Sequence, residues 1–198
     1  MNLTKRLNQS TRSRGFWGTL RWIYNGFFAV KKFTVYYLSL NKVIIPKSFN
    51  SQIRLQKISK EELHVIREKE KDLSVEFYCD ITHNFSTPFV ALIGKKIAAI
   101  NWLVFPGQFS RFLNLEEYDA ELNYNTVLPQ FRGRRLAEKL MSFIIVDCQK
   151  KHLKRMFCVV SVDNVPQFKQ LINLGFVPIE TLTHFAFHRP KATLKYAK

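Results

Sequence analysis

The sequence predicts a mixed α/β domain with helices on both faces of one sheet. Segments of strand-like composition alternate with segments of helical periodicity between residues 51 and 190, which is typical of this fold class. Two of the expected helices begin directly after a strand, where such sheets usually bind ligands. The chain has 198 residues, 46% of them hydrophobic and 23% charged. It can therefore bury a core, and a wholly disordered chain is excluded.

The first half of this domain is expected to form a strand, two helices and a hairpin. The alternating segment Ile53–Ile58 predicts the strand, and Ser59 with Glu62 is a capping box that starts a helix. Gly94 separates two apolar runs and predicts the hairpin turn. The expected bounds are 53–58 for the strand, 60–69 and 73–81 for the helices, and 87–93 and 97–105 for the hairpin strands.

The second half is expected to add strands and two further helices. One strand ends before Pro129, and Gly133 opens a long helix with an apolar stripe that includes Leu140 and Cys148. Pro166 suits the first turn of another helix, which ends before Gly175. The expected bounds are 118–127 for the strand, 134–151 for the helix, 155–162 for the next strand, and 176–179 and 182–188 for the last two.

The positive charge is concentrated at the N-terminus. The chain has 31 Lys and Arg against 15 Asp and Glu, and its first 60 residues contain twelve basic residues and no acidic one. We therefore predict a basic, aromatic arm at 1–50 before a domain at 51–198. Within the arm, the apolar residues Leu20, Ile23, Phe27 and Val30 have helical spacing.

Three interpretations of the arm remain open. Residues 14–40 could contact an anionic membrane surface, pack as a helix on the chain's own domain, or bind nucleic acid, which the sequence supports least. No apolar run is long enough to span a bilayer, and no secretory signal is expected. Three cysteines without a CxxC pair predict reduced thiols. We expect a cytoplasmic protein, with a peripheral position at the inner membrane face as an alternative and a mitochondrial location as a minority interpretation.

One segment carries most of the chemical information. A strand, a turn ending at Pro129 and the tetrad Arg132-Gly-Arg-Arg135 lead into a helix. The free N–H groups at a helix start bind anions, and the helix dipole strengthens that binding. Glycine allows close approach of the backbone, so a diphosphate is the ligand that such a place suits. The alternative is a helix start with a solvated basic face.

This segment resembles the coenzyme A motif of the general-control-related N-acetyltransferases, the GNAT superfamily. Val127, Pro129, Arg132, Gly133 and Ala137 match the motif. Downstream, Asn164 and the pair Gly175-Phe176 resemble the family's second signature. More loosely, the basic aromatic N-terminus is similar to that of GNAT proteins encoded with bacterial cell-surface polysaccharide genes.

The resemblance implies a mostly antiparallel sheet that splays into a V and binds acetyl-CoA between two diverging strands. The residues that it implies for coenzyme A binding are Thr126, Val127, Leu128, Arg132, Gly133, Arg134, Arg135, Leu136, Ala137 and Asn164. The implied reaction is direct transfer of the acetyl group to an amine of an unidentified acceptor in a ternary complex. The acceptor is expected near residues 73–85 and 108–117, and no metal is expected.

A general base must deprotonate the amine, because a lysine-like amine with a pKa of about 10.4 is almost fully protonated at pH 7. In the family this base is often a carboxylate on the strand before the pyrophosphate loop. Glu121 and Asp119 lie on that strand and, two residues apart, share one face. We favour Glu121 over Asp119; the alternative is that both are ordinary strand carboxylates. Tyr124 could line the substrate side.

Two positions depart from the family pattern. Arg135 stands where the family has Gly, and Leu171 stands where the family often has a Tyr that protonates the leaving thiolate. These departures keep open a catalytically inactive GNAT fold that serves as a membrane-surface or partner-binding module. An acyltransferase that uses a longer acyl chain on a carrier protein is a further alternative. Packing is the favoured interpretation of Trp102, Cys148 and Cys158.

Overall fold

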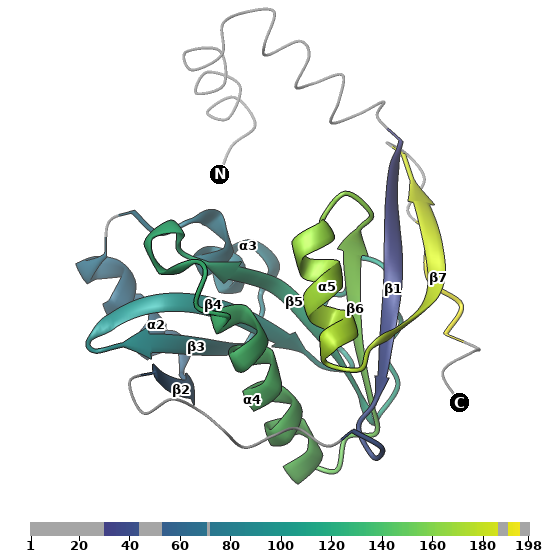
Figure 1. Cartoon of the computed structure of the whole chain (residues 1–198), viewed down its shortest axis with the longest axis horizontal. Helices are drawn as coiled ribbons and strands as arrows, with labels where there is room; N and C mark the ends of the chain where they lie inside the picture. The colour runs from purple at the N-terminus through teal and green to yellow at the C-terminus, as the bar shows by residue number, and fades with distance from the viewer. Residues whose placement is uncertain (1–29, 44–52, 71, 186–189, 195–198) are drawn as a thin grey trace, which may run out of the picture.

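The computed structural model describes residues 30–43, 53–70, 72–185 and 190–194, and seven strands form one sheet in it (Figure 1). The strand order is β2-β3-β4-β5-β6-β1-β7. All neighbouring strands are antiparallel except β5 and β6, which are parallel. The strands are β1 Lys31–Ser39, β2 Ile53–Lys57, β3 Thr87–Ile93, β4 Lys96–Val104, β5 Asp119–Val127, β6 Arg155–Ser161 and β7 Val177–His184.

The helices start and end at the signals that the sequence carries. Ser59 and Glu62 form the predicted capping box, in which each side chain accepts from the other residue's backbone N–H. Pro166 lies in the first turn of its helix, and Gly175 follows the end with a φ of +87°. The helices are α2 Lys60–Lys69, α3 Cys79–His83, α4 Leu136–Lys150 and α5 Val165–Asn173, with 3₁₀ helices η1 Val75–Tyr78 and η2 Pro129–Phe131.

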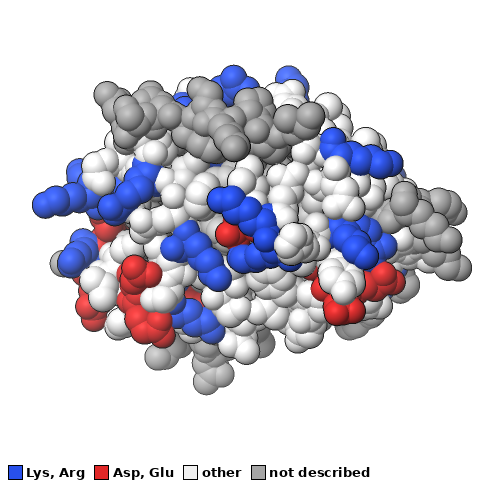
Figure 2. All heavy atoms as spheres, turned by 90° about the horizontal axis from the view of Figure 1, so that it is seen from below, with Lys and Arg blue, Asp and Glu red and all other residues white. Residues whose placement is uncertain are grey.

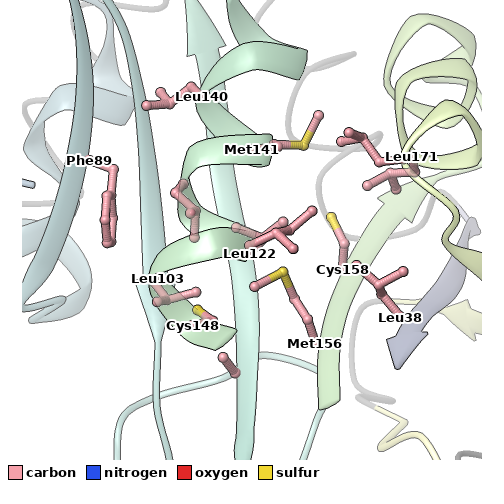
Figure 3. Close-up of a cluster of buried hydrophobic side chains, with 14 of the residues drawn as sticks. Leu38, Phe89, Leu103, Leu122, Leu140, Met141, Cys148, Met156, Cys158 and Leu171 are labelled. Atoms are coloured by element: carbon pink, nitrogen blue, oxygen red, sulfur yellow. The ribbon is translucent and has the colours of Figure 1, made fainter. Parts of the chain in front are cut away.

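Two of the three apolar clusters among the described residues lie on opposite faces of the sheet. On one face, α4 and α5 bury their apolar sides against the strands, and Leu140, Met141 and Cys148 of α4 belong to one buried cluster with Leu122 and Cys158 of the sheet (Figure 3). On the other face, α2, η1 and α3 cover residues of β3 and β4. The prediction of a mixed sheet covered on both faces, mostly antiparallel as in GNAT proteins, is confirmed.

The prediction of an arm over residues 1–50 is wrong for Lys31–Ser39. These residues form β1, which pairs with β6 on one side and β7 on the other. The segment is rich in β-branched and aromatic side chains, which fit a pleated surface between two strands. Its buried residues include Val35, Tyr36 and Leu38. Val30, by contrast, is 62% exposed. The remainder of the predicted membrane-contacting segment, up to residue 29, lies outside the described residues.

Four expected elements differ in detail. Residues 73–81 form η1 and α3 rather than one helix, and the two expected final strands are the single strand β7, which pairs with β1 along most of its length. Helix α4 begins at Leu136 rather than at residue 134. The backbone of Arg135 has a left-handed conformation, with φ +55° and ψ +30°, so this residue cannot belong to the helix.

The charged surface does not form one continuous area on the face drawn in Figure 2. Lys and Arg side chains lie in several separate places there, with Asp and Glu side chains beside some of them. Among the residues that the structure describes, no helix is both long and apolar enough to cross a membrane.

Candidate active site

The parallel strands β5 and β6 diverge and open a gap in the sheet. They pair from Asp119 to Leu122 and from Arg155 to Cys158, and no further pairing between them is found in the described chain. Just beyond, a β-bulge places Tyr124 and Asn125 opposite the single residue Asn101 on β4, and Tyr124 has a φ of +50°. The gap is the V that the GNAT resemblance implies, and it leaves strand edges free to pair with a ligand.

A pocket of about 280 Å³ fills this gap. Thr126, Asn164 and Gln167 line it on the side of α4 and α5, where Gln167 accepts from Asn125 Nδ2 at 3.1 Å. On the other side the lining comes from η1, the segment before β3, the loop between β4 and β5, and the start of β1. Both segments predicted to hold the acceptor, 73–85 and 108–117, therefore line the pocket.

The turn between β5 and α4 presents free backbone amides. Gly133 has a φ of +79°, and a Cβ added to it would meet no atom within 4 Å. From Gly133 to Glu138, no backbone amide has an acceptor in the described chain. The next amide, that of Lys139, donates to the carbonyl of Arg135. The amides from Gly133 to Ala137 therefore suit a pyrophosphate. Leu136 and Ala137 are buried and could contribute only their backbone.

The strand residues before this turn differ in what they could offer. Thr126 lines the pocket. The Val127 carbonyl accepts from Arg132 Nε at 3.3 Å. The amide of Leu128 donates to the Ala98 carbonyl at 2.9 Å, and its own carbonyl accepts from Phe131. Both backbone groups of Leu128 thus have protein partners, so this residue supports the turn rather than offering a free pairing edge.

Arg135 points away from the phosphate turn. Its guanidinium donates to both carboxylate oxygens of Glu138, at 3.1 and 2.6 Å, and the side chain is 70% exposed. The pair with Glu138 raises the pKa of Arg135. The Arg side chain therefore replaces the family's Gly without covering the amides, although the left-handed backbone is strained for a residue with a Cβ.

We expect Arg135→Gly to leave the melting temperature nearly unchanged, because relief of strain offsets the loss of the Glu138 contact and the added freedom of the unfolded chain. Arg135→Val is expected to lower it by about 3 °C or more, because a β-branched residue fits this backbone poorly. Thermal unfolding measures both values. Equal stability of the Val variant and the parent would contradict a left-handed Arg135.

The two predicted carboxylates have different surroundings. Glu121 is 2% exposed and lines the pocket, and its Oε2 has no hydrogen-bond partner in the described part of the chain. Burial raises the pKa of Glu121 to about 7, against smaller lowering effects of the Ser110 hydroxyl and the Lys191 ammonium. Such a carboxylate is suited to accept a proton near neutral pH.

Asp119 is fully buried in an ion pair at the closed end of the V. Arg155 donates to its two oxygens at 2.6 and 2.9 Å, and the Glu116 amide donates to it at 2.7 Å. Asp119 is not among the residues that line the pocket. Its carboxylate is therefore placed to hold β5 against β6, and Glu121 is the better placed of the two for proton transfer.

The remaining predicted residues take structural positions. Asn164 caps α5 by accepting from the Gln167 amide at 3.3 Å, and it also lines the pocket. Leu171 and Trp102 are fully buried. Cys148 and Cys158 are buried as predicted, and burial raises the pKa of Cys148 to about 12. Within the described ranges, no group of three or more His, Cys, Asp or Glu is arranged to bind a metal ion.

Several pocket residues were not singled out from the sequence. Phe33 was assigned to the arm, and Glu76, Phe109 and Arg111 carry no motif. The only available signal for the last three was the expectation that their two segments face the acceptor. Phe33 could have been found from the strand-like segment Phe33–Tyr37, which is rich in β-branched and aromatic residues.

Comparisons with known proteins agree with this geometry. The model of the acetyltransferase (GNAT) family matches residues 53–176, and no curated protein matches the chain. Solved structures with similar folds include a GNAT acetyltransferase from Novosphingobium aromaticivorans, with 13% identity, a TM-score of 0.54 and coverage of 79% of this chain and 64% of that one. Another is the GNAT acetyltransferase from Colwellia psychrerythraea, with 16% identity, a TM-score of 0.54 and coverage of 86% of this chain and 63% of that one. A third is the GCN5-related N-acetyltransferase from Sphaerobacter thermophilus, with 12% identity, a TM-score of 0.55 and coverage of 85% of this chain and 55% of that one.

The chain spans less than two thirds of the length of each of these solved structures. At such low identity the structural likeness shows the fold, while the family model covers more than half of the chain. The chain therefore belongs to the GNAT family of acetyltransferases.

Proposed function

We propose that the protein transfers an acetyl group from acetyl-CoA directly to an amine. The observation that carries this proposal is Glu121, a buried carboxylate that lines a pocket between two diverging strands. Its pKa of about 7 lets it switch between protonated and ionised forms at neutral pH. Membership of the GNAT family supports acetyl transfer in general.

The residues present fit acetyl-CoA. Bound there, it would supply the activated acetyl thioester. The amides from Gly133 to Ala137 would hold the pyrophosphate, with Arg132 and Arg134 adding positive charge. The edge of β5 at Thr126 and Val127, which does not pair with β6 in the described chain, would lie along the extended arm of the molecule. Asn164, which faces the same pocket, would contact it from the start of α5.

Glu121 would remove the amine proton. A lysine-like amine is neutral in only about one molecule in a thousand at pH 7, so a base at the reaction site raises the reactive fraction. Ionised Glu121 can take this proton because its Oε2 is not engaged by another donor of the described chain. The coenzyme A thiolate leaves readily, because the pKa of a thiol is near 8.5. Leu171 in place of a Tyr therefore does not prevent the transfer.

We expect Gly133→Glu to weaken coenzyme A binding at least about tenfold, because a carboxylate at this turn repels the pyrophosphate and fills the space left by the missing Cβ. Isothermal titration with acetyl-CoA measures the affinity. Gly107→Glu is the matched control, since Gly107 has a similar φ of +82° and open surroundings but lies outside both the turn and the pocket lining.

Three outcomes of this titration carry information. Micromolar binding by the parent and by the control, lost in Gly133→Glu, supports the proposal. Equal affinity of all three proteins would place the ligand elsewhere. No binding by the folded parent would reject acetyl-CoA and favour a longer acyl donor on a carrier protein or a catalytically inactive fold.

A further inference from the structure

The pocket is bounded on one side by a fixed aromatic wall. The rings of Phe33 from β1 and Phe112 from the loop before β5 lie 4.7 Å apart. The Arg111 guanidinium packs on both rings, at 4.9 Å from Phe112 and 5.6 Å from Phe33, and contacts His184 Nε2 at 3.3 Å. Arg111 therefore holds the two rings in position.

A second aromatic wall of the same pocket includes Tyr124 of β5. It consists of Phe85, Phe109 and Tyr124, all of which line the pocket. The His83 ring stacks on Tyr124 at 5.1 Å and on Phe109 at 6.2 Å, and a 3.0 Å hydrogen bond joins His83 Nε2 to Tyr124 Oη. Phe85 lies 5.8 Å from Tyr124. These contacts preorganise the wall before any ligand enters.

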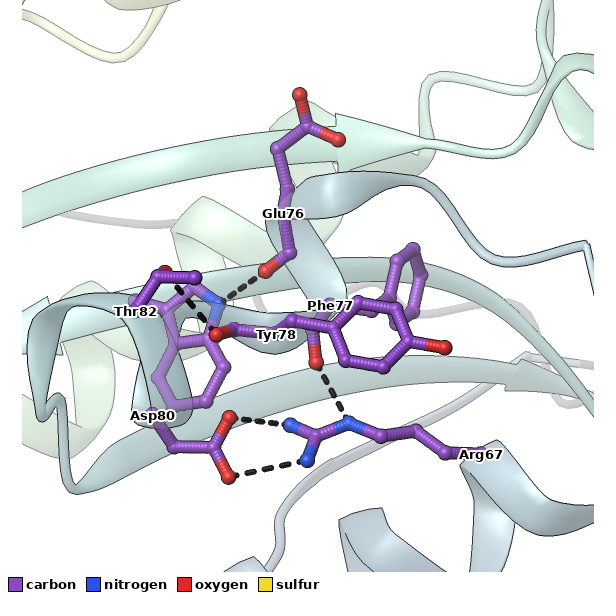
Figure 4. Close-up of polar contacts among 7 residues, drawn as sticks. Arg67, Glu76, Phe77, Tyr78, Asp80 and Thr82 are labelled. Atoms are coloured by element: carbon purple, nitrogen blue, oxygen red, sulfur yellow. Dashed lines mark hydrogen bonds and ion pairs between the residues drawn. The ribbon is translucent and has the colours of Figure 1, made fainter. Parts of the chain in front are cut away.

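Two carboxylates lie in the same pocket. Besides Glu121, Glu76 of η1 lines it and forms no ion pair with a residue that the structure describes. The backbone of η1 is clamped, since Trp102 Nε1 donates to the Glu76 carbonyl and Arg67 Nε to the Phe77 carbonyl, both at 2.8 Å. In Figure 4 the Glu76 side chain points away from the buried Arg67–Asp80 ion pair that completes this clamp.

These features define what the pocket could bind. Carboxylates favour a cation, and aromatic faces bind both ammonium groups and flat rings. The volume of about 280 Å³ lies at the lower limit of pockets for drug-sized ligands, and the reacting thioester must share it. An acceptor with one ring system fits this space and can pack on the aromatic side chains, whereas a flexible lysine chain has no ring to pack on them.

We propose that the acceptor is an arylalkylamine, a primary amine joined by a short chain to one aromatic ring system that packs on the aromatic walls, with its ammonium group directed to Glu121 and attracted by Glu76. This proposal rests on the proposed acetyl transfer for its chemistry. The ammonium group loses two protons: Glu121 takes the first, and the neutral amine then attacks the thioester carbonyl. As the amide C–N bond forms and the thioester C–S bond breaks, the second proton passes to the leaving thiolate, which is released as the thiol.

The test compares 2-phenylethylamine with n-hexylamine, which has the same charge and a similar reach, and with Nα-acetyl-lysine amide. We expect the parent to bind 2-phenylethylamine at least about tenfold more tightly than either alternative by isothermal titration, and kcat/KM to follow the same order. Phe109→Ala should remove this preference. Phe109 is 55% exposed, so its removal should spare the fold, and Phe168→Ala is the matched control at 41% exposure, outside the pocket lining.

The binding measurement separates this proposal from the acetyl transfer itself. Turnover with acetyl-CoA that is equal or faster for n-hexylamine or the lysine amide would overturn the arylalkylamine while leaving the transferase intact. If acetyl-CoA fails to bind, binding of 2-phenylethylamine that depends on Phe109 would still support the aromatic site. Absence of that binding, or equal loss in the Phe168 control, would reject it.

Discussion

Replacing Glu121 with Gln is expected to lower kcat by about 10²–10⁴-fold, the usual contribution of a positioned base. The amide has almost the same shape as the carboxyl group, so the buried site stays filled, but it cannot accept the amine proton. Affinity for acetyl-CoA should stay within about twofold, because Glu121 lies outside the pyrophosphate turn. Release of the coenzyme A thiol during turnover gives the rate.

The pH profile makes this prediction specific. Because the pKa of Glu121 is about 7, kcat/KM of the parent should rise with pH up to this value as the carboxylate ionises, and Glu121→Gln should lose this rise. Glu117→Gln is the control, since Glu117 is an exposed carboxylate on the loop leading to the same strand. A Gln variant that keeps the inflection, or more than a tenth of the parent kcat, would assign the proton transfer to another group.

The same burial makes a prediction about stability. The folded chain binds the Glu121 proton more tightly than the unfolded chain does, since burial raises the pKa from 4.5 to about 7. Its contribution to stability is therefore complete below pH 4.5 and is lost as pH rises through 7. At about 1.4 kcal/mol per pKa unit the loss amounts to roughly 3 kcal/mol. Glu121→Gln should thus be more stable than the parent at pH 8.5, and not at pH 4.5, in urea unfolding.

Local signals in the sequence were enough to predict most of the fold. The capping box at Ser59 and Glu62, the hairpin turn at Gly94 and the glycine after α5 each act within a few residues. Their effect therefore does not depend on the rest of the chain. The phosphate turn was predictable for the same reason, since a strand, a glycine and a helix start are adjacent in sequence.

Features that depend on distant residues could not be predicted. Strand β1 gains its place from β6 and β7, which lie more than a hundred residues later in the chain, and β propensity alone depends strongly on such context. Alternation places Glu121 and Asp119 on one face but cannot show that Arg155 pairs with Asp119 while Glu121 lines the pocket. The aromatic walls likewise combine β1, the segment before β3 and the β4–β5 loop.

Removing the Arg155 side chain is expected to be the most destabilising of the changes considered. Asp119 is fully buried and Arg155 is 20% exposed by its side chain, and the two residues face each other in the parallel register of β5 and β6. In Arg155→Met, Asp119 loses its cationic partner while remaining in the interior. Breaking a buried pair in this way costs about 3–5 kcal/mol of the free energy of unfolding.

Because of its position, loss of this ion pair should disturb the candidate active site as well as the stability of the fold. Asp119 and Arg155 close the end of the V, only two residues before Glu121, so loss of the pair lets the paired ends of β5 and β6 separate. The double variant Asp119→Asn with Arg155→Met should recover part of the stability, because no charge is then buried alone. Lys151→Met breaks the exposed pair with Asp147 and should cost less than about 1 kcal/mol. A similar loss from Lys151→Met and Arg155→Met in urea unfolding would show that the buried pair does not hold the strands together.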